Sequence, residues 1–326
     1  MSRVLCIIAL LLASMPAFAQ SRVATLKAAA DVREAFLSPR SDRIAASVGE
    51  DRIAIWSLPD GKLLQDLKLA QRPVSMLFAG TDQMIVALAD GGIEVRTIAT
   101  GAAVRRMDAG VRQPVLAVSA DGRLLASSGT EQIRLWDASG TLLRTFGHEF
   151  GSMATLAFSP DAKLLVSAGF DADVHFWDVS TGQRKGSLPD RLLTTFAMAF
   201  TADGRNLVIG GANGSIEIID VPTAAVARRF SAEKYAVVYV SVSPDGGSIG
   251  AAYMDVNGMS RPAPVAVWER TTGRVVRRAA PPGPPANSGF TADGRFLYVT
   301  TKGPELDVWA LPGSASSSSG DTTRKR

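Results

Sequence analysis

The chain has 326 residues, of which 35 are lysine or arginine and 31 are aspartate or glutamate, giving a formal net charge of +4. Its single cysteine, Cys6, lies in the first apolar segment, so the rest of the chain cannot form disulfides, a thiol nucleophile, a cysteine-ligated zinc site or a c-type haem attachment. The positive excess is concentrated in Arg3 and in residues 324–326, so the composition predicts no basic face and no nucleic-acid partner.

The first nineteen residues have the pattern of a secretory signal peptide. Arg3 precedes an apolar run, Val4–Ala13, and the small-residue pattern A-F-A ends at Ala19. The run is too short to span a bilayer, which needs about 20 apolar residues, and no later segment is longer. We therefore expect residues 1–19 to be a signal peptide cleaved after Ala19, residues 20–311 to form one domain without a transmembrane segment, and the protein to be periplasmic or secreted.

A short phrase recurs along the whole chain. FSPDAKLL at 158–165 returns in altered form, for example as FTADGRNL from Phe200 and VSPDGGSI from Val242. Its small hydroxyl or alanine position falls at Ser38, Ala79, Ser119, Ser159, Thr201, Ser243 and Thr291. The successive steps are 41, 40, 40, 42, 42 and 48 residues, which predicts seven repeats of one structural unit.

A second column has the same period. It holds Trp56, Trp136, Trp177, Trp268 and Trp309, with Arg96 and Ile219 in the two vacant positions. One and three residues before each of these stand apolar, mostly β-branched residues, and such alternation predicts a buried strand. This strand comes third in its repeat, after two strands joined by an S-P-D or T-A-D-G turn, and a weaker fourth strand follows. The sequence therefore predicts an all-β, seven-bladed β-propeller of four-stranded antiparallel blades.

The fourth repeat, 147–178, resembles a nearly complete WD repeat of the WD40-like β-propeller family. Its Gly-His, S-P-D, serine and Trp-Asp landmarks stand in order, and L-W-D at 135–137 is a second literal match. The resemblance also implies how the ring closes. The seventh repeat, 288–311, stops after its third strand, so the N-terminal strand in 21–32 is expected to complete the last blade and remove an open sheet edge.

The stretch GFDADVHFWD at 169–178 gathers three aspartates and a histidine, as a metal site or an acid/base cluster would. The repeats favour a structural interpretation. The positions that match Asp173 and His175 in the other repeats hold arbitrary, mostly polar residues, as expected where a strand side chain meets solvent. The resemblance implies a structural network that consists, residue by residue, of His148, Ser167, Asp171 and Trp177.

GGSIG at 246–250 matches the G-x-S-x-G of serine hydrolases, with Ser248 in the place of the nucleophile. That motif works where a strand turns sharply into a helix and a histidine base is within reach. Ser248 instead follows an S-P-D-G hairpin turn and enters another strand, so we interpret it as part of a hairpin. No other catalytic or cofactor motif is present, and we expect no catalytic residue, no cofactor and no metal.

The largest departure from the repeat is in the sixth unit, where YMDVNGMSRPAP from Tyr253 lengthens the turn between the second and third strands. PPGPP at 281–285 lengthens the next link and is expected to emerge on the same face. Loops on a rigid scaffold often carry binding residues, although a tolerated insertion would have the same pattern. The candidate partner-binding residues predicted on this face are Tyr253, Met254, Met259, Arg261, Phe170, Tyr235, Arg72, Arg112 and Arg191.

The tail, 312–326, is serine-rich and basic at its end. We expect a disordered terminus, the alternative being contact of its last charges with an acidic surface. For the whole chain we expect a non-catalytic protein-interaction scaffold, monomeric by itself, with a protein partner of unknown identity. The A-F-A-Q junction and the Ala- and Arg-rich composition suggest a bacterial periplasmic protein. The alternative is a cofactor- or metal-binding propeller enzyme, lactonase-like or quinone-cofactor-like, with acidic, histidine or arginine ligands around its central channel.

Overall fold

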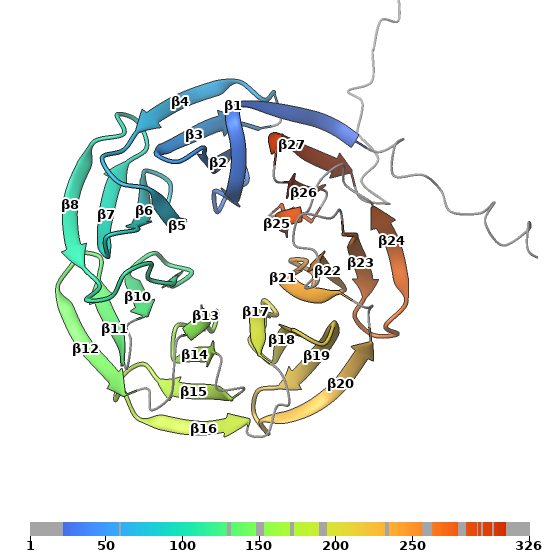
Figure 1. Ribbon diagram of the computed structural model, residues 1–326. Helices are drawn as coiled ribbons and strands as arrows, with labels where there is room; N and C mark the ends of the chain where they lie inside the picture. Colours follow the sequence, from blue (N-terminus) through green and yellow to red (C-terminus); the bar gives the residue numbers. More distant parts are fainter. Residues whose placement is uncertain are drawn as a thin grey trace, which may run out of the picture.

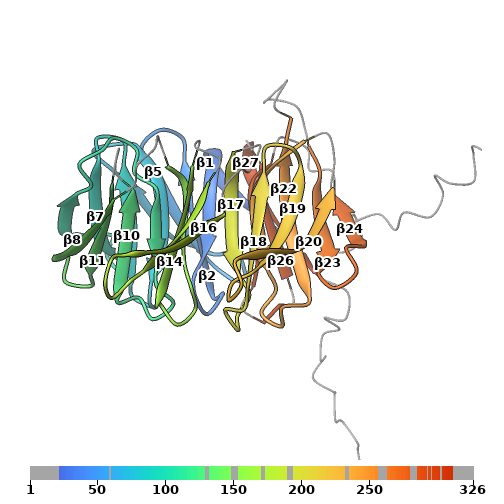
Figure 2. The same cartoon turned by 90° about the horizontal axis from the view of Figure 1, so that it is seen from below.

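The computed structural model describes residues 22–58, 60–128, 132–147, 153–169, 173–188, 194–231, 235–255, 263–279, 285–291, 293–294, 296–301 and 303–310. The expected signal peptide and tail lie outside these ranges. All regular structure in the described ranges is β-strand, and they contain no helix long and apolar enough to cross a membrane. The strands form blades arranged as a ring, which is seen along its axis in Figure 1 and from the side in Figure 2.

Each blade runs outwards from the axis through four strands. The innermost strands are β1 (Arg22–Leu37), β5 (Pro73–Ala79), β9 (Leu116–Val118), β13 (Met153–Phe158), β17 (Thr195–Phe200), β21 (Ala236–Val242) and β25 (Pro285–Phe290). The second strands are β2 (Arg43–Val48), β6 (Gln83–Leu88), β10 (Leu124–Ser128), β14 (Leu164–Gly169), β18 (Asn206–Gly211), β22 (Ser248–Met254) and β26 (Phe296–Thr301). The third strands are β3 (Arg52–Ser57), β7 (Gly92–Thr97), β11 (Gln132–Asp137), β15 (Val174–Asp178), β19 (Ser215–Asp220), β23 (Val265–Glu269) and β27 (Gly303–Ala310). The outermost strands are β4 (Leu63–Lys68), β8 (Ala103–Asp108), β12 (Leu142–Gly147), β16 (Arg184–Leu188), β20 (Ala225–Ser231) and β24 (Val275–Ala279). All pairings are antiparallel, and the predicted seven-bladed propeller is confirmed.

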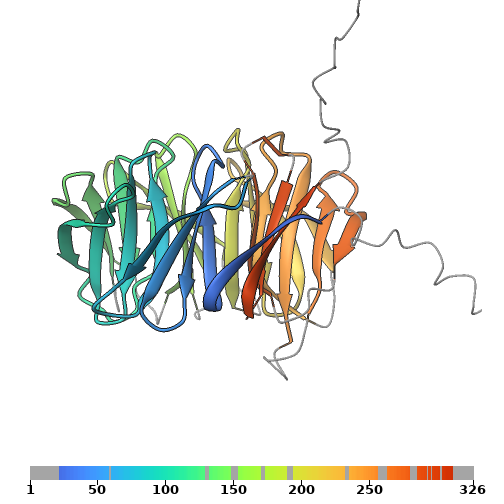
Figure 3. The same ribbon diagram turned by 90° about the horizontal axis from the view of Figure 1, so that it is seen from above.

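The ring is closed by β1, which belongs to two blades. Its first part pairs with β27, where Thr25 lies opposite Asp307, and its last part pairs with β2, where Ala35 lies opposite Ala46. The Thr25 hydroxyl donates a hydrogen bond of 2.7 Å to Asp307 Oδ1. In Figure 3 the dark blue β1 leaves the red strands of blade seven and turns into blade one. The N-terminal strand therefore completes the last blade, as predicted, and covers an edge that would otherwise be open.

The core lies between successive blades. At four of these interfaces an apolar residue of an outer strand lies in one core cluster with the tryptophan-column residue of the next blade: Met107 with Trp136, Phe146 with Trp177, Leu188 with Ile219 and Phe230 with Trp268. Two of these pairs are aromatic. The ring of Phe146 meets Trp177 edge-on with centroids 6.0 Å apart, and Phe230 stacks on Trp268 at 5.9 Å. Both arrangements are favourable for aromatic rings and add to the burial of their apolar area. Because the repeats are alike, successive blades pack against one another through similar interfaces.

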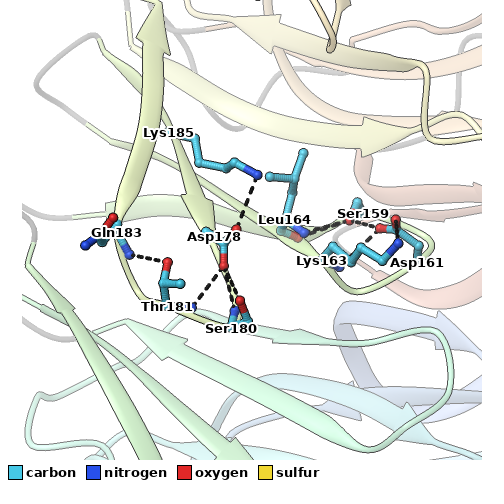
Figure 4. A network of polar contacts seen from close by, with 9 residues as sticks. All are labelled: Ser159, Asp161, Lys163, Leu164, Asp178, Ser180, Thr181, Gln183 and Lys185. Carbon is cyan, nitrogen blue, oxygen red and sulfur yellow. Dashed lines mark hydrogen bonds and ion pairs between the residues drawn. The ribbon is translucent and has the colours of Figure 1, made fainter.

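The turns on one face are held by short polar networks, shown for blade four in Figure 4. At the S-P-D turn the Ser159 hydroxyl donates to Asp161 at 2.7 Å and accepts the Leu164 amide at 3.0 Å. At the Trp-Asp turn, Asp178 accepts the hydroxyl and the amide of Ser180, and the Lys185 ammonium lies 3.2 Å away. These contacts, the Ser180 hydroxyl first, hold the pKa of Asp178 well below its usual value. The aspartates of both motifs are therefore turn acceptors.

Candidate functional site

The tryptophan of blade four is held by a buried hydrogen bond. The Trp177 indole Nε1 donates to Ser167 Oγ at 2.9 Å, and both side chains are buried. Blade three has the equivalent bond from Trp136 to Ser127, at 3.0 Å. Two members of the network implied by the family resemblance are thus bonded directly, in a place with no solvent access.

His175 is not at the surface, which corrects the expectation from the repeats. It is 3% exposed, and its ring lies 5.9 Å from that of Trp177. The same column is buried in other blades, at Ala54, Glu94, Glu217, Ala266 and Asp307. The third strand has strands on both sides and a blade over each face, so even its polar residues are enclosed. The acids of the column have partners: Glu94 pairs with Arg96 and Arg106, and Glu217 with Arg229.

The mixed character of this column therefore reflects buried polar pairing instead of solvent contact. Asp173, two residues before His175, is half-buried at the start of β15. Within the described part of the chain, no three histidine, cysteine or acidic side chains are grouped so that they could hold a metal ion.

Tyr253 was expected to contact a partner, and the structure places it in the core instead. Its side chain is completely buried, and its hydroxyl accepts the Trp268 indole N–H at 2.9 Å. The strand β22 continues through Met254. Because side chains alternate along a strand, Ile249, Ala251 and Tyr253 lie on the same buried face of the blade. The Tyr253 hydroxyl therefore accepts the tryptophan N–H in blade six, as the Ser167 hydroxyl does in blade four. In the sequence, the alternation in I-G-A-A-Y at 249–253 already indicated that the second strand extends to Tyr253.

The other described candidates lie on the face where the inner strands begin. Tyr235 precedes β21 and Met254 ends β22, and the pairing of Ala236 with Met254 places them at the same end of blade six. Both are half-buried, and Tyr235 packs against the core between blades. Arg72 is half-buried and Arg112 exposed, in the links that lead to β5 and β9. Outside the described residues lie His148, Phe170, Asp171, Arg191, Met259 and Arg261.

A feature that the sequence analysis missed is an apolar band on the outer rim of blades one to three. It is made of Leu63 and Leu64 on β4, Val104 on β8, and Leu142 and Leu143 on β12, which are 40 to 51% exposed. These strands follow one another on the outside of the ring in Figure 1. Exposed apolar side chains at the same place on three successive outer strands are candidates for an interaction surface.

A β-bulge explains why neighbouring residues both face outwards. Between β3 and β4, Trp56 lies opposite Leu63 but Ile55 lies opposite Gln65, so Leu64 is an extra residue. Val104 and Leu143 are the extra residues at the same place in the next two blades. A bulge redirects its extra side chain and breaks the simple alternation. In blade four the extra residue is the exposed Lys185, which ends the band.

Comparison with known proteins agrees with this architecture. Residues 140–178 match the family described as WD domain, G-beta repeat. This segment is similar to a WD repeat. The chain is 33% identical over 140 residues to the WD repeat-containing protein SL1-17 of Schistosoma mansoni, covering 42% of this chain and 46% of that protein. It is 30% identical over 194 residues to the Target of rapamycin complex subunit wat1 of Schizosaccharomyces pombe, covering 58% and 59%.

The chain thus spans about half the length of these curated WD-repeat relatives. Among solved structures it is similar to a chain from the crystal structure of a mitotic checkpoint complex, with a TM-score of 0.78. That similarity covers 89% of this chain and 92% of the other at 18% identity, and it therefore bears on the fold alone.

Proposed function

We propose that this chain is a non-catalytic protein-interaction scaffold of an exported, bacterial periplasmic type, and that the apolar band of blades one to three is its principal contact surface. The band carries the proposal because Leu63, Leu64, Val104, Leu142 and Leu143 are large apolar side chains exposed on three successive outer strands, and a partner that covers them would remove that apolar area from water. The name of one similar protein, a subunit of a complex, supports a role in assemblies.

Two further observations favour a scaffold over a propeller enzyme. The acids buried between blades, such as Glu94 and Glu217, are paired with arginines. The aspartates of the repeat motifs, such as Asp161 and Asp178, are used by turns. The loop-bearing face with Tyr235, Met254, Arg72 and Arg112 is a second candidate surface.

Site-specific photo-crosslinking tests the band. A photoreactive phenylalanine analogue replaces Leu64 or Leu143 in the full chain, the variant is expressed in bacteria that have a periplasm, and the cells are irradiated. From both positions we expect discrete crosslinked products that contain a second protein besides this chain. The matched control is Val276, the extra residue of the same bulge in blade six, which stands outside the band and is 38% exposed.

Crosslinks of equal yield from Val276, or none from either leucine, would contradict the band as the contact surface. A strong product from Met254 alone would transfer the role to the loop-bearing face. Failure of the chain to reach the periplasm, measured by fractionation, would contradict the exported type separately.

A further inference from the structure

The centre of the ring holds a cavity of about 590 Å³. It is lined by the inner strands of blades one to six. Most of the lining residues are apolar, including Phe36, Leu77, Phe196, Met198 and Phe200, while polar atoms make up more than half of the surface that faces the cavity. These side chains are half-buried, as expected where one side of each faces the cavity. Cavities of this size that combine apolar side chains with polar groups are found at sites for small organic ligands.

One carboxyl group stands in this lining. Glu34 lies on β1, and among the residues that line the cavity there is no other acid and no lysine, arginine or histidine. No hydrogen bond or ion pair to its carboxyl is present among the described residues. The adjacent Arg33 turns away to the Gly49 carbonyl and to Glu50. Burial raises the pKa of Glu34 to about 7.

The backbone holds Glu34 at this position. The pairing of β1 with β2 shifts register between Val32 and Glu34, and the Glu34 amide donates to Ser47 Oγ at 3.2 Å. The titratable groups near it from other blades are phenols. Tyr239 of β21 lines the same cavity, and Tyr298 of β26 donates a hydrogen bond of 3.1 Å to the Ala35 carbonyl. No cation from these strands faces the carboxyl.

We propose that the central channel binds a small organic amine with an apolar body, whose ammonium group pairs with the Glu34 carboxylate. The aromatic and aliphatic lining takes the apolar body, which gains by leaving water. The ammonium offsets the charge of a half-buried carboxylate that has no other partner among the described residues, and partial burial of an unpaired charge is costly. This site is separate from the apolar band and does not depend on the scaffold function.

The proposal predicts a specific dependence on pH. An amine remains protonated near neutrality while Glu34 loses its proton as the pH rises through about 7. Binding therefore strengthens from about pH 6 to about pH 8, by roughly tenfold if only the ionised form binds. A neutral ligand of the same shape has no such dependence.

Calorimetric titration of the full chain with 2-phenylethylamine and with 2-phenylethanol tests this. We expect the amine to bind at least about tenfold more tightly than the alcohol at pH 8, a difference of about 1.4 kcal/mol. Glu34→Gln, which keeps the shape of the side chain, should remove that preference and leave the alcohol unaffected. Ala157→Phe, which fills the channel, should weaken both ligands.

Equal affinity for amine and alcohol, no binding of the amine, or amine binding that survives Glu34→Gln would overturn the proposal. So would binding that survives Ala157→Phe, because the ligand would then lie elsewhere. Thermal unfolding shows that each variant is folded. Thermal unfolding of Glu34→Gln also gives a separate test. The stability that the neutral form of Glu34 contributes is present below pH 4.5 and is lost as the pH rises through about 7. The variant should therefore be more stable than the original chain only at the higher pH.

Discussion

Blade four and blade six solve the same packing problem with different residues. In blade four Trp177 donates to a serine of the neighbouring strand and meets Phe146 edge-on. In blade six Trp268 donates to Tyr253, two residues further along the second strand than the serine position, and stacks face-to-face with Phe230. A buried indole N–H needs an acceptor, because leaving it unpaired is costly, but several side chains can supply one. The fold therefore depends on the satisfied tryptophan and not on one particular motif residue.

The largest effect is expected where blade six differs most. Tyr253→Ala removes a completely buried ring and the acceptor of Trp268 together, so it should cost about 3–5 kcal/mol in the free energy of unfolding. Urea unfolding followed by tryptophan fluorescence measures this. Met254→Ala, at the next and half-buried position, is the control and should cost about 1 kcal/mol or less. A smaller loss at Tyr253 than at Met254 would mean that this tyrosine does not support the core.

Removing only the acceptor of the tryptophan N–H should lower the free energy of unfolding by similar amounts in blade four and blade six. Tyr253→Phe and Ser167→Ala each leave a buried indole N–H without its present partner, so each should cost about 1–3 kcal/mol. The measurement is again urea unfolding of the full chain. Nearly equal losses would sharpen the view that the bond is equivalent in both blades. No loss for Ser167→Ala would show that the serine of the WD repeat is dispensable where the tyrosine is not.

The smallest effect concerns the turns that follow the third strands. Asp178 is half-buried and its pKa is lowered, first of all by the Ser180 hydroxyl. Its contribution to stability is therefore present above its ordinary pKa of 3.8 and is lost as the pH falls below that value. Asp178→Asn should therefore lower the unfolding midpoint slightly at neutral pH and not at acid pH. In blade six the corresponding Glu269 accepts the Thr272 hydroxyl, and Glu269→Gln is the matched comparison. A constant difference across the pH range would rule out ionisation as the cause for Asp178.

The residues that sequence analysis placed well are those whose role is local or repeated. Ser159 and Asp161 were expected in a turn, and they bond within a few residues of themselves. His175 was placed wrongly at the surface because its column has mixed composition, and composition does not reveal that a neighbouring blade covers that face. Tyr253 was placed in a loop because its repeat is irregular there, although β22 continues one residue beyond it.

The sequence by itself determined the number of blades, their strands and the turns between them. Each of these depends on the period of about forty residues, on alternation within a strand or on turn chemistry, and such signals are carried by neighbouring residues. The strand that closes the ring was implied by the resemblance to the WD40-like family. Only the tertiary structure decided which side chains face outwards at a bulge, such as Leu64 and Leu143, and which face the axis, such as Glu34. Those positions depend on register shifts between strands and on the gathering of inner strands around one axis, and neither is written in a single repeat.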